Sequence, residues 1–256
     1  THEYSSSYRG RVQNRKIDAV FLPMFQLSFS QYDNGVKSYQ AYDRDVEQFN
    51  LRQKPLRKLY VRCDVKTLTE DENKAVFAVI DSLSAAIGAS RNIAKEKGLL
   101  IQRAVANTVV QNYADAISDL TVYISTDSTS AMAYWQRAVC QARMNEFEAS
   151  QGKDVGLLTL NAMADLDKAI SLSPHNPYVY YDRGNLHAVS KDYVKAVADY
   201  TKAIELDPNF AEAYYNRGIA NINLKKTEEG IRDLSKAGEL GLYNAYSIIK
   251  KYSNKK

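Results

Sequence analysis

The stretch YYDRG at Tyr180–Gly184 returns as YYNRG at Tyr214–Gly218 and as YWQRA at Tyr134–Ala138. The two glycines lie 34 residues apart, and Ala138 lies 34 residues after Ala104. Self-similarity at this period is the sequence signature of a helical solenoid. We therefore expect repeated units that stack on one another, because a single unit cannot bury its own apolar face.

Each unit has the periodicity of two helices. In PNFAEAYYNRGIANI, which ends at Ile222, apolar and aromatic residues recur at the i, i+3, i+4 and i+7 spacing of an amphipathic helix. YVKAVADYTKAIEL, which begins at Tyr193, has the same periodicity, and DPN at Asp207–Asn209 ends it because proline cannot continue a helix. Two helices joined by a short turn predict an αα-hairpin in each unit.

The repeat sets the boundaries of the units. In three units the residue 19 positions after the recurring Gly or Ala is Tyr123, Ala203 or Ala237. In the second unit Ala138 and Ala169 are 31 positions apart instead of 19, so that unit contains 12 additional residues. We predict four units at 97–130, 131–176, 177–210 and 211–244, a capping helix at 245–256, and a degenerate repeat helix with a linker at 69–96.

Residues 1–68 have a different pattern. IDAVFL and MFQLSFSQY, between Ile17 and Tyr32, contain β-branched and aromatic residues that alternate with polar ones. SYQAYDRDVEQFNLR returns to helical spacing, and RKLYVRCDV, which ends at Val65, alternates again. We predict a small β-β-α-β module that caps the first repeat, since it is too small to be an independent domain.

The repeat pattern resembles the tetratricopeptide repeat, which implies a mainly α fold, a right-handed α-α superhelix. The family signature falls on Tyr180, Gly184, Ala196, Tyr200, Ala203 and Pro208, on Tyr214, Gly218, Leu234 and Ala237, on Tyr134, Ala138, Leu166, Ala169 and Pro174, and on Ala104, Ala116 and Leu120. The chain departs from the pattern at Leu100, Tyr123, His187, Asn221 and Gly230.

The strands ahead of the repeats also look like the layout of tetratricopeptide proteins common in Bacteroidetes bacteria. That resemblance implies an exported fragment of a longer chain with no assigned biochemical activity. The sequence begins with Thr1 and has no signal-peptide pattern, which we interpret as a processed or excised form.

In every unit an arginine stands directly before the recurring Gly or Ala. An aspartate on the second helix stands four residues before Tyr123, Ala169, Ala203 or Ala237. In an antiparallel hairpin these two positions lie opposite each other, so we predict a repeated ion pair that fixes the register of the helices. The predicted pairs are Arg103 with Asp119, Arg137 with Asp165, Arg183 with Asp199, and Arg217 with Asp233. An arginine row for anionic ligands is the less favoured interpretation, because the four aspartates would neutralise it.

Catalytic signals are absent from the sequence. The three histidines lack the spacing of metal ligands, and Cys63 and Cys140 have no local histidine partner and form no C-x-x-C motif. Two buried free thiols are favoured over one disulfide. Glu146, Glu148 and Asp154 are interpreted as a solvated charge cluster rather than an acid/base pair. We predict no catalytic residue, no metal and no cofactor, and therefore not an enzyme.

Composition also limits the partners. The formal net charge is +4, from 34 basic and 30 acidic residues, which is too even to favour nucleic acid. No apolar run approaches the roughly 18 residues that a membrane span needs. We expect a protein or peptide partner.

The resemblance implies that the first helix of each unit lines a concave groove. The contact residues that it implies are Trp135, Gln136 and Arg143, then Tyr178, Tyr181, Asp182 and Asn185, then Tyr215, Asn216 and Asn223. The aromatic rings of Trp135, Tyr181 and Tyr215 suit binding anchors, and they equally suit a role in filling space between neighbouring helices.

Two functional hypotheses follow. The first is a non-enzymatic scaffold that holds a peptide or helix of a partner in the groove, with Asn185 and Asn216 as hydrogen-bonding groups. The alternative is a structural module of a larger complex, which acts through self-association or has its groove filled by the insertion around Asn145–Leu158.

Overall fold

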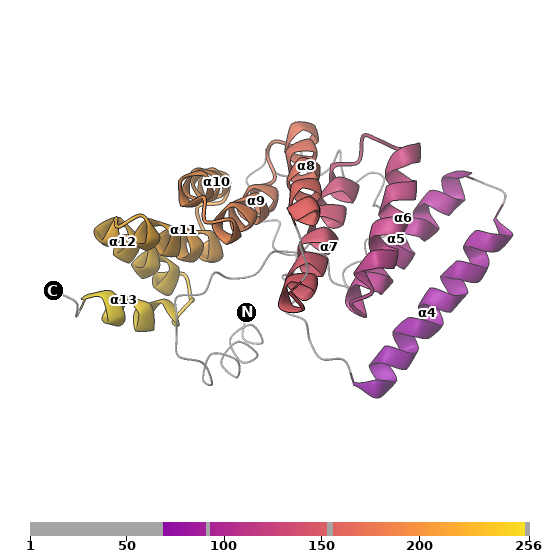
Figure 1. Ribbon diagram of the computed structural model, residues 1–256, viewed down its shortest axis with the longest axis horizontal. Coiled ribbons are helices and arrows are strands. Elements are labelled where there is room, and N and C mark those ends of the chain that lie inside the picture. Colours follow the sequence, from indigo (N-terminus) through magenta and orange to yellow (C-terminus); the bar gives the residue numbers. More distant parts are fainter. Residues whose placement is uncertain (1–68, 91–92, 153–155, 254–256) are drawn as a thin grey trace. The chain divides into compact units, whose positions relative to one another are not determined.

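The computed structural model describes residues 69–90, 93–152 and 156–253. Within these ranges the regular secondary structure is entirely α-helical, in agreement with the mainly α fold that the repeat predicts (Figure 1). The predicted β-β-α-β module at 1–68 lies outside the described residues.

The helices follow one another as hairpins separated by short turns. Their bounds are α4 Glu70–Ala89, α5 Ile93–Val109, α6 Tyr113–Thr126, α7 Ala131–Ser150, α8 Gly156–Leu172, α9 Pro177–Val189, α10 Tyr193–Leu206, α11 Ala211–Asn223, α12 Thr227–Glu239 and α13 Ala245–Ser253. The chain divides into two compact units at the start of α9, after Val179, and each is described separately below.

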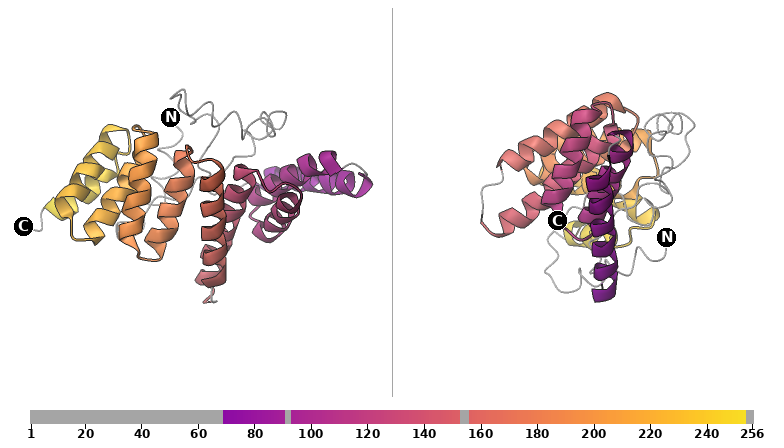
Figure 2. Two further views of the ribbon diagram at one scale, coloured as in Figure 1. Left: turned by 90° about the horizontal axis from the view of Figure 1, so that it is seen from above. Right: turned by 90° about the vertical axis from the view of Figure 1, so that its right-hand side faces the viewer.

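In the first unit, α4, α5, α6, α7 and α8 each pack against the next helix along the chain (Figure 2). α4 begins with a capping box: the Thr69 hydroxyl accepts from the Glu72 backbone N–H at 3.2 Å, and a Glu72 carboxylate oxygen accepts from the Thr69 N–H at 2.8 Å. The core between α5, α6 and α7 is formed by Ile101, Ala104, Val105, Ala116, Leu120, Tyr123, Ile124, Ala133 and Cys140.

In the second unit, α10 packs against α11, α11 against α12 and α12 against α13. The apolar core at the C-terminal end contains Tyr215, Ile219, Ile222, Leu234, Ala237, Ala245 and Ile248. Helix α13 therefore covers the apolar face that α12 would otherwise leave exposed.

Three of the hairpin turns use one left-handed residue to end the first helix. Gln111, Lys191 and Lys225 have φ angles of 63°, 62° and 66°. The residue after each donates its N–H to a carbonyl five positions earlier, as from Lys226 to Asn221 at 2.9 Å. This αL ending satisfies carbonyls that the helix terminus leaves without a partner.

In the second hairpin the left-handed residue, Gly152 with a φ angle of 76°, comes seven positions later than the repeat predicts. Asn145 stands 34 positions after Gln111, yet α7 continues through it to Ser150, and α8 begins at Gly156. The described part of the insertion thus lengthens the two helices of the hairpin. Its apolar side chains Phe147 and Leu160 are 57% and 68% exposed.

The recurring Gly marks a close approach between helices. A Cβ atom on Gly184 would lie 2.7 Å from the Tyr200 ring, and one on Gly218 would lie 2.9 Å from the carbonyl oxygen of Gly230. The first hairpins have Leu120 and Leu166 at the place of Tyr200, and they have alanine in place of this glycine. The α11/α12 hairpin has Gly218 opposite Leu234, so a leucine on the second helix occurs with either glycine or alanine on the first.

Candidate interaction surface

The arginine of every repeat holds its aspartate through two parallel hydrogen bonds. In all four hairpins Nε donates to Oδ2 at 2.8–2.9 Å and Nη2 donates to Oδ1 at 2.6–2.7 Å. These are the pairs that the sequence predicts, Arg103 with Asp119, Arg137 with Asp165, Arg183 with Asp199, and Arg217 with Asp233. This two-pronged geometry is specific to a guanidinium and fixes the register of the two helices.

The tyrosine that opens each repeated motif explains why Y-x-x-R recurs. Its ring lies under the guanidinium three residues later, with 5.5–5.8 Å between the guanidinium carbon and the ring centroid. The pairs are Tyr134 with Arg137, Tyr180 with Arg183, and Tyr214 with Arg217. Leu100 takes this place in the first hairpin, so the cation–π contact is missing there.

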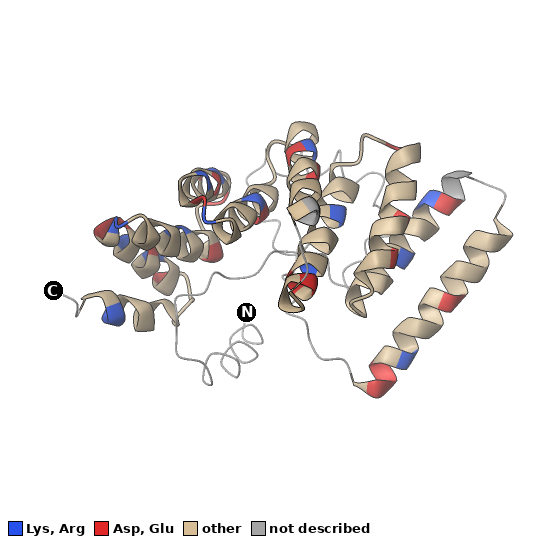
Figure 3. Cartoon of the chain, viewed as in Figure 1, with Lys and Arg blue, Asp and Glu red and all other residues tan. Residues whose placement is uncertain are grey.

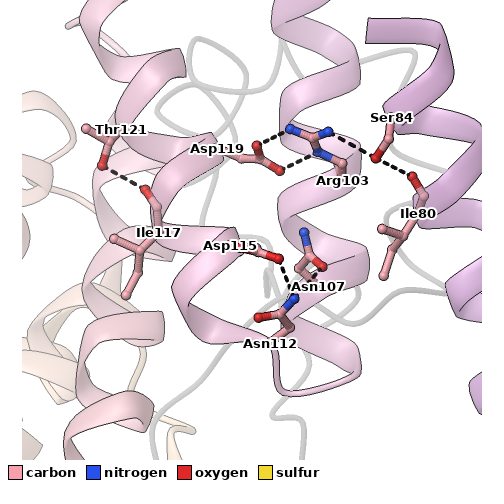
Figure 4. A network of polar contacts seen from close by, with 9 residues as sticks. All are labelled: Ile80, Ser84, Arg103, Asn107, Asn112, Asp115, Ile117, Asp119 and Thr121. Atoms are coloured by element: carbon pink, nitrogen blue, oxygen red, sulfur yellow. Dashed lines mark hydrogen bonds and ion pairs between the residues drawn. The ribbon is translucent and has the colours of Figure 1, made fainter. Parts of the chain in front are cut away.

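A third hydrogen bond ties the arginine to the preceding hairpin or helix. Arg137 Nη1 donates to Thr121 Oγ1 at 3.1 Å, and Arg217 Nη1 donates to Thr201 Oγ1 at 3.1 Å. In Figure 4, Arg103 lies between Asp119 on α6 and Ser84 on α4, and its Nη1 donates to the serine hydroxyl at 3.0 Å. Sequence reasoning missed this bond, although both threonines stand 16 positions before their arginine.

The hydrogen bond to aspartate shifts the proton equilibrium of the arginines. It raises the pKa of Arg103 and of Arg137 above the ordinary value, against the opposing effect of burial. The four guanidinium groups are charged and each has a carboxylate, so they are structural cations. Acidic and basic residues are interspersed along the described helices (Figure 3).

The residues that the resemblance implies for ligand contact are mostly buried. Trp135, Tyr181, Asp182 and Asn216 have no exposed surface. Tyr178, Gln136, Tyr215 and Asn185 are 2–5% exposed. Asn223, by contrast, is exposed, and its side-chain amide donates to the Ile219 carbonyl at 2.9 Å.

Several of these aromatic rings contact one another. The Trp135 ring stacks on Tyr178, with 6.5 Å between centroids and 22° between planes. Tyr181 lies 4.9 Å from Phe210 and 5.8 Å from Tyr200, centroid to centroid. These contacts are the ones that the space-filling role requires.

The predicted amide groups of the second unit form a buried network. The Asn216 amide donates to Asn185 Oδ1 at 2.8 Å and to the Tyr181 hydroxyl at 2.9 Å. The Tyr200 hydroxyl donates to Asn185 Oδ1 at 2.8 Å, and burial raises its pKa well above the ordinary tyrosine value. The network joins α9, α10 and α11, and Tyr200 is the member that the sequence gave only as a signature residue and not as a contact residue.

On α7 the corresponding side chains have a different environment. Arg143 Nη1 donates to Glu146 Oε2 at 3.2 Å, while its Nε and Nη2 and the Gln136 Nε2 are buried and have no hydrogen-bond partner in the part of the chain that the structure describes. Arg143 and Gln136 are seven residues apart, so they lie on one face of the helix.

The remaining titratable groups fit a structural role. Cys140 is a free, buried thiol whose Sγ lies 3.3 Å from the Thr108 hydroxyl, and burial raises its pKa to about 11. His187 lies 3.8 Å from an Asp199 carboxylate oxygen, and burial lowers its pKa although the carboxylate opposes the shift. A thiol of this kind is protonated and unreactive near neutral pH.

Two searches over the described residues concern metals and membranes. Among residues 69–90, 93–152 and 156–253, no group of three or more His, Cys, Asp and Glu side chains could hold a metal ion. No helix in these ranges is apolar over the length that crossing a bilayer requires.

The arrangement as a whole defines a repeat protein built from helical hairpins. Two family models of the tetratricopeptide repeat match the chain, one at residues 177–210 and one at 199–232. The first covers α9 and α10, and the second extends from α10 into α12. Together the two matches extend over residues 177–232. No curated protein matches the chain in sequence.

Solved structures share the fold. The crystal structure of MamA is 22% identical with a TM-score of 0.57, and the match covers 71% of this chain and 99% of MamA. MamA 41-end from Desulfovibrio magneticus RS-1 is 16% identical with a TM-score of 0.55, over 80% of this chain and 94% of that one. At these identities the similarity concerns the fold alone.

Proposed function

We propose that this chain is a non-enzymatic tetratricopeptide-repeat scaffold that binds a peptide or a helix of a partner protein along the first helices of its hairpins. The observation that carries the proposal is the recurrence, in α7, α9 and α11, of an aromatic and a polar residue directly before the arginine. These are Trp135 and Gln136, Tyr181 and Asp182, and Tyr215 and Asn216.

The geometry of the ion pair assigns a direction to these residues. Because the arginine faces the second helix of its own hairpin, the residue two positions earlier is rotated by about 200° and points away from that helix. The aromatic and polar pairs therefore lie on the side of each first helix that its hairpin does not use. In stacked repeats a partner can run along this side of successive hairpins within one compact unit.

Aromatic and amide side chains are suited to that task. A ring offers a large contact area with little loss of conformational freedom, and an amide can donate to and accept from a peptide backbone. Four of these side chains, Trp135, Tyr181, Asp182 and Asn216, have no exposed surface, so a partner would contact them only after the side chains that cover them move.

A structural role through self-association is the second candidate. The lengthened α7/α8 hairpin favours it, since Phe147 and Leu160 expose apolar surface there. A second copy of the chain could cover these side chains. Light scattering of the full chain, compared with a Phe147→Ser, Leu160→Ser variant, tests this directly.

The experiment for the main proposal combines capture with mapping. The immobilised full chain is incubated with extract of the source organism, a retained protein is purified, and hydrogen exchange of the chain is compared with and without it. We expect slower exchange in α7, α9 and α11. Slowing confined to α8, α10 and α12 would contradict binding along the first helices, and no retained protein together with a dimer in light scattering would favour the alternative.

A further inference from the structure

Helix α4, the first helix of the described residues, has the register of the second helix of a hairpin (Figure 1). Its Ser84 hydroxyl accepts a hydrogen bond from Arg103 Nη1 at 3.0 Å. Thr121 of α6 and Thr201 of α10 accept the same bond from the arginine of the following helix, each at 3.1 Å. The described residues begin at 69, directly before α4, so they do not include a first helix for this hairpin.

The hydroxyl at Ser84 identifies the face of α4 that a first helix would cover. The core positions of a second helix lie five and one residues before this hydroxyl and two residues after it, where α6 has Ala116, Leu120 and Tyr123. All three of these side chains are buried. The same positions of α4 hold Val79, Leu83 and Ala86.

This face of α4 is partly open, unlike its counterparts. Val79 is 36% exposed, whereas Ala116 and Ala196 at its place in α6 and α10 are fully buried. Ala75 and Ser82 lie on the same face, four residues before Val79 and three residues after it, and both are exposed. A second helix with an apolar face of this kind is incomplete until another helix covers it.

One position distinguishes this face from those of the other second helices. Ser82 stands where the four hairpins from α5/α6 to α11/α12 have the aspartate of the ion pair. Each of those aspartates accepts two hydrogen bonds from an arginine of the first helix. A first helix for α4 must therefore lack that arginine, because its buried charge would have no carboxylate.

The sequence ahead of α4 contains a segment of this kind. Residues 39–52 lie outside the described residues, and they have an apolar stripe at helical spacing without arginine, formed by Tyr39, Tyr42, Val46 and Phe49. The 17 residues at 53–69 separate this segment from α4. Fully extended they span about 55–60 Å, whereas the 20 residues of α4 are about 30 Å long. The connection is therefore long enough for the segment to return antiparallel along α4.

We propose that residues 39–52 form the first helix of a hairpin with α4 and cover Val79, Ser82 and Ala86. The side chains of the apolar stripe replace water on this face, and the array of repeats then begins with a complete hairpin. This face of α4 is thus an internal contact of the chain and not a surface for a partner protein.

Crosslinking of the full chain tests the contact. Val46→Cys and Val79→Cys are introduced together with Cys63→Ser, and the two new thiols are joined by a short bismaleimide. Cys140 is kept, because its thiol is buried and burial raises its pKa to about 11. We expect a crosslink between positions 46 and 79 within one chain, identified by mass spectrometry of its peptides. Tyr42→Cys or Phe49→Cys in place of Val46→Cys repeats the test at other points of the stripe.

A second position on α4 is the control. Asp81 is exposed and lies about 200° around the helix from Val79. Asp81→Cys should therefore give about tenfold less crosslink than Val79→Cys, since only side chains held together have a high effective concentration. Equal yields from the two positions, or no crosslink from any point of the stripe, would overturn the proposal. A covalent dimer linked through position 79 would also overturn it and assign the face to a second copy.

Hydrogen exchange provides an independent measurement. Val46→Asp with Phe49→Asp places two charges in the contact and should speed amide exchange in α4 about tenfold or more. Gln40→Asp with Gln48→Asp adds the same charges on the opposite side of the predicted helix and should leave the exchange of α4 unchanged. If the two variants exchange equally in α4, the apolar stripe does not cover it and the proposal is wrong.

Discussion

The hairpins α7/α8 and α11/α12 hold the same ion pair across different lengths of chain. The Nη2–Oδ1 distance is 2.7 Å in both, although 28 residues separate Arg137 from Asp165 and only 16 separate Arg217 from Asp233. The first helix of one ends in a left-handed residue, Lys225, whereas the other continues beyond the corresponding position. The contact between the helices, and not the turn, therefore sets the register.

The two hairpins differ in the hydrogen bonding of the side-chain amides on their first helices. In α11 the Asn216 amide donates to two buried partners, whereas in α7 the Gln136 amide nitrogen finds none within the described residues. The same helical hairpin thus contains a fully hydrogen-bonded polar network in α11 and a buried donor without a partner among the described residues in α7.

The largest expected effect comes from breaking the shared ion pair. Arg137→Met and Arg217→Met should each reduce the free energy of unfolding by about 3 kcal/mol, because a buried aspartate loses its countercharge. Urea unfolding followed by circular dichroism measures both. Adding Asp165→Leu to Arg137→Met should restore most of the loss. Clearly unequal costs in the two hairpins would show that the pairs are not equivalent.

The next effect concerns the contact at the recurring glycine. Gly184→Ala should cost about 1–3 kcal/mol, since its Cβ would lie 2.7 Å from the buried Tyr200 ring. Ala138→Gly at the same place in α7 should cost about 1 kcal/mol, through helix propensity alone. The double variant Gly184→Ala, Tyr200→Leu reproduces the alanine–leucine pair of the α7/α8 hairpin. Failure of Tyr200→Leu to reduce the penalty would contradict the steric explanation.

Removal of the insertion tests whether the turn matters. Deletion of residues 147–158 restores 19 positions between Ala138 and Ala169 and should change the free energy of unfolding by no more than about 1 kcal/mol, because loop length contributes only weakly. Thermal and urea unfolding of the shortened chain give the value. A loss of several kcal/mol would mean that the lengthened helices support the hairpin.

The smallest effect is a pH dependence at His187. Burial lowers its pKa in the folded state, so the unfolded chain binds more protons, and stability should fall as the pH drops through and below the ordinary histidine value of about 6.5. The next hairpin has Asn221 at this place, and its amide donates to Asp233 at 3.3 Å. His187→Asn should therefore flatten the stability profile between pH 7.5 and pH 5.5. An unchanged profile would assign the titration to another group.

The framework was predictable from the sequence because it repeats. A 34-residue period, alternating helices and an aspartate four residues before the repeat position of Tyr123, Ala169, Ala203 and Ala237 are enough to place hairpins and ion pairs, since every unit solves the same packing problem. The stacking of Tyr214 on Arg217 and the bond to Thr201 were missed for a different reason. They depend on side-chain direction and on contact between hairpins, which a residue pattern within one unit does not specify.

Less of the candidate site could be predicted from the sequence. The resemblance to the repeat family implied Gln136 and Arg143 as contact residues, but only the structure shows that their donors are buried without partners among the described residues. It also shows that Asn185 and Asn216 are partners of each other. Polar satisfaction is a property of the packed molecule, because it depends on which groups from distant positions meet.

The hydrogen bonds of Arg137 and Arg217 to a hydroxyl of the preceding hairpin make the array directional. When α6 unwinds, Arg137 loses its bond to Thr121 before its own hairpin has opened, and α10 has the same effect on Arg217 through Thr201. Loss of order therefore weakens the next hairpin in one direction along the chain. Within each compact unit, a pulling force on the first helix would therefore unfold the hairpins one after another. Each of these arginines would lose its hydrogen bond to the preceding hairpin before the ion pair of its own hairpin breaks.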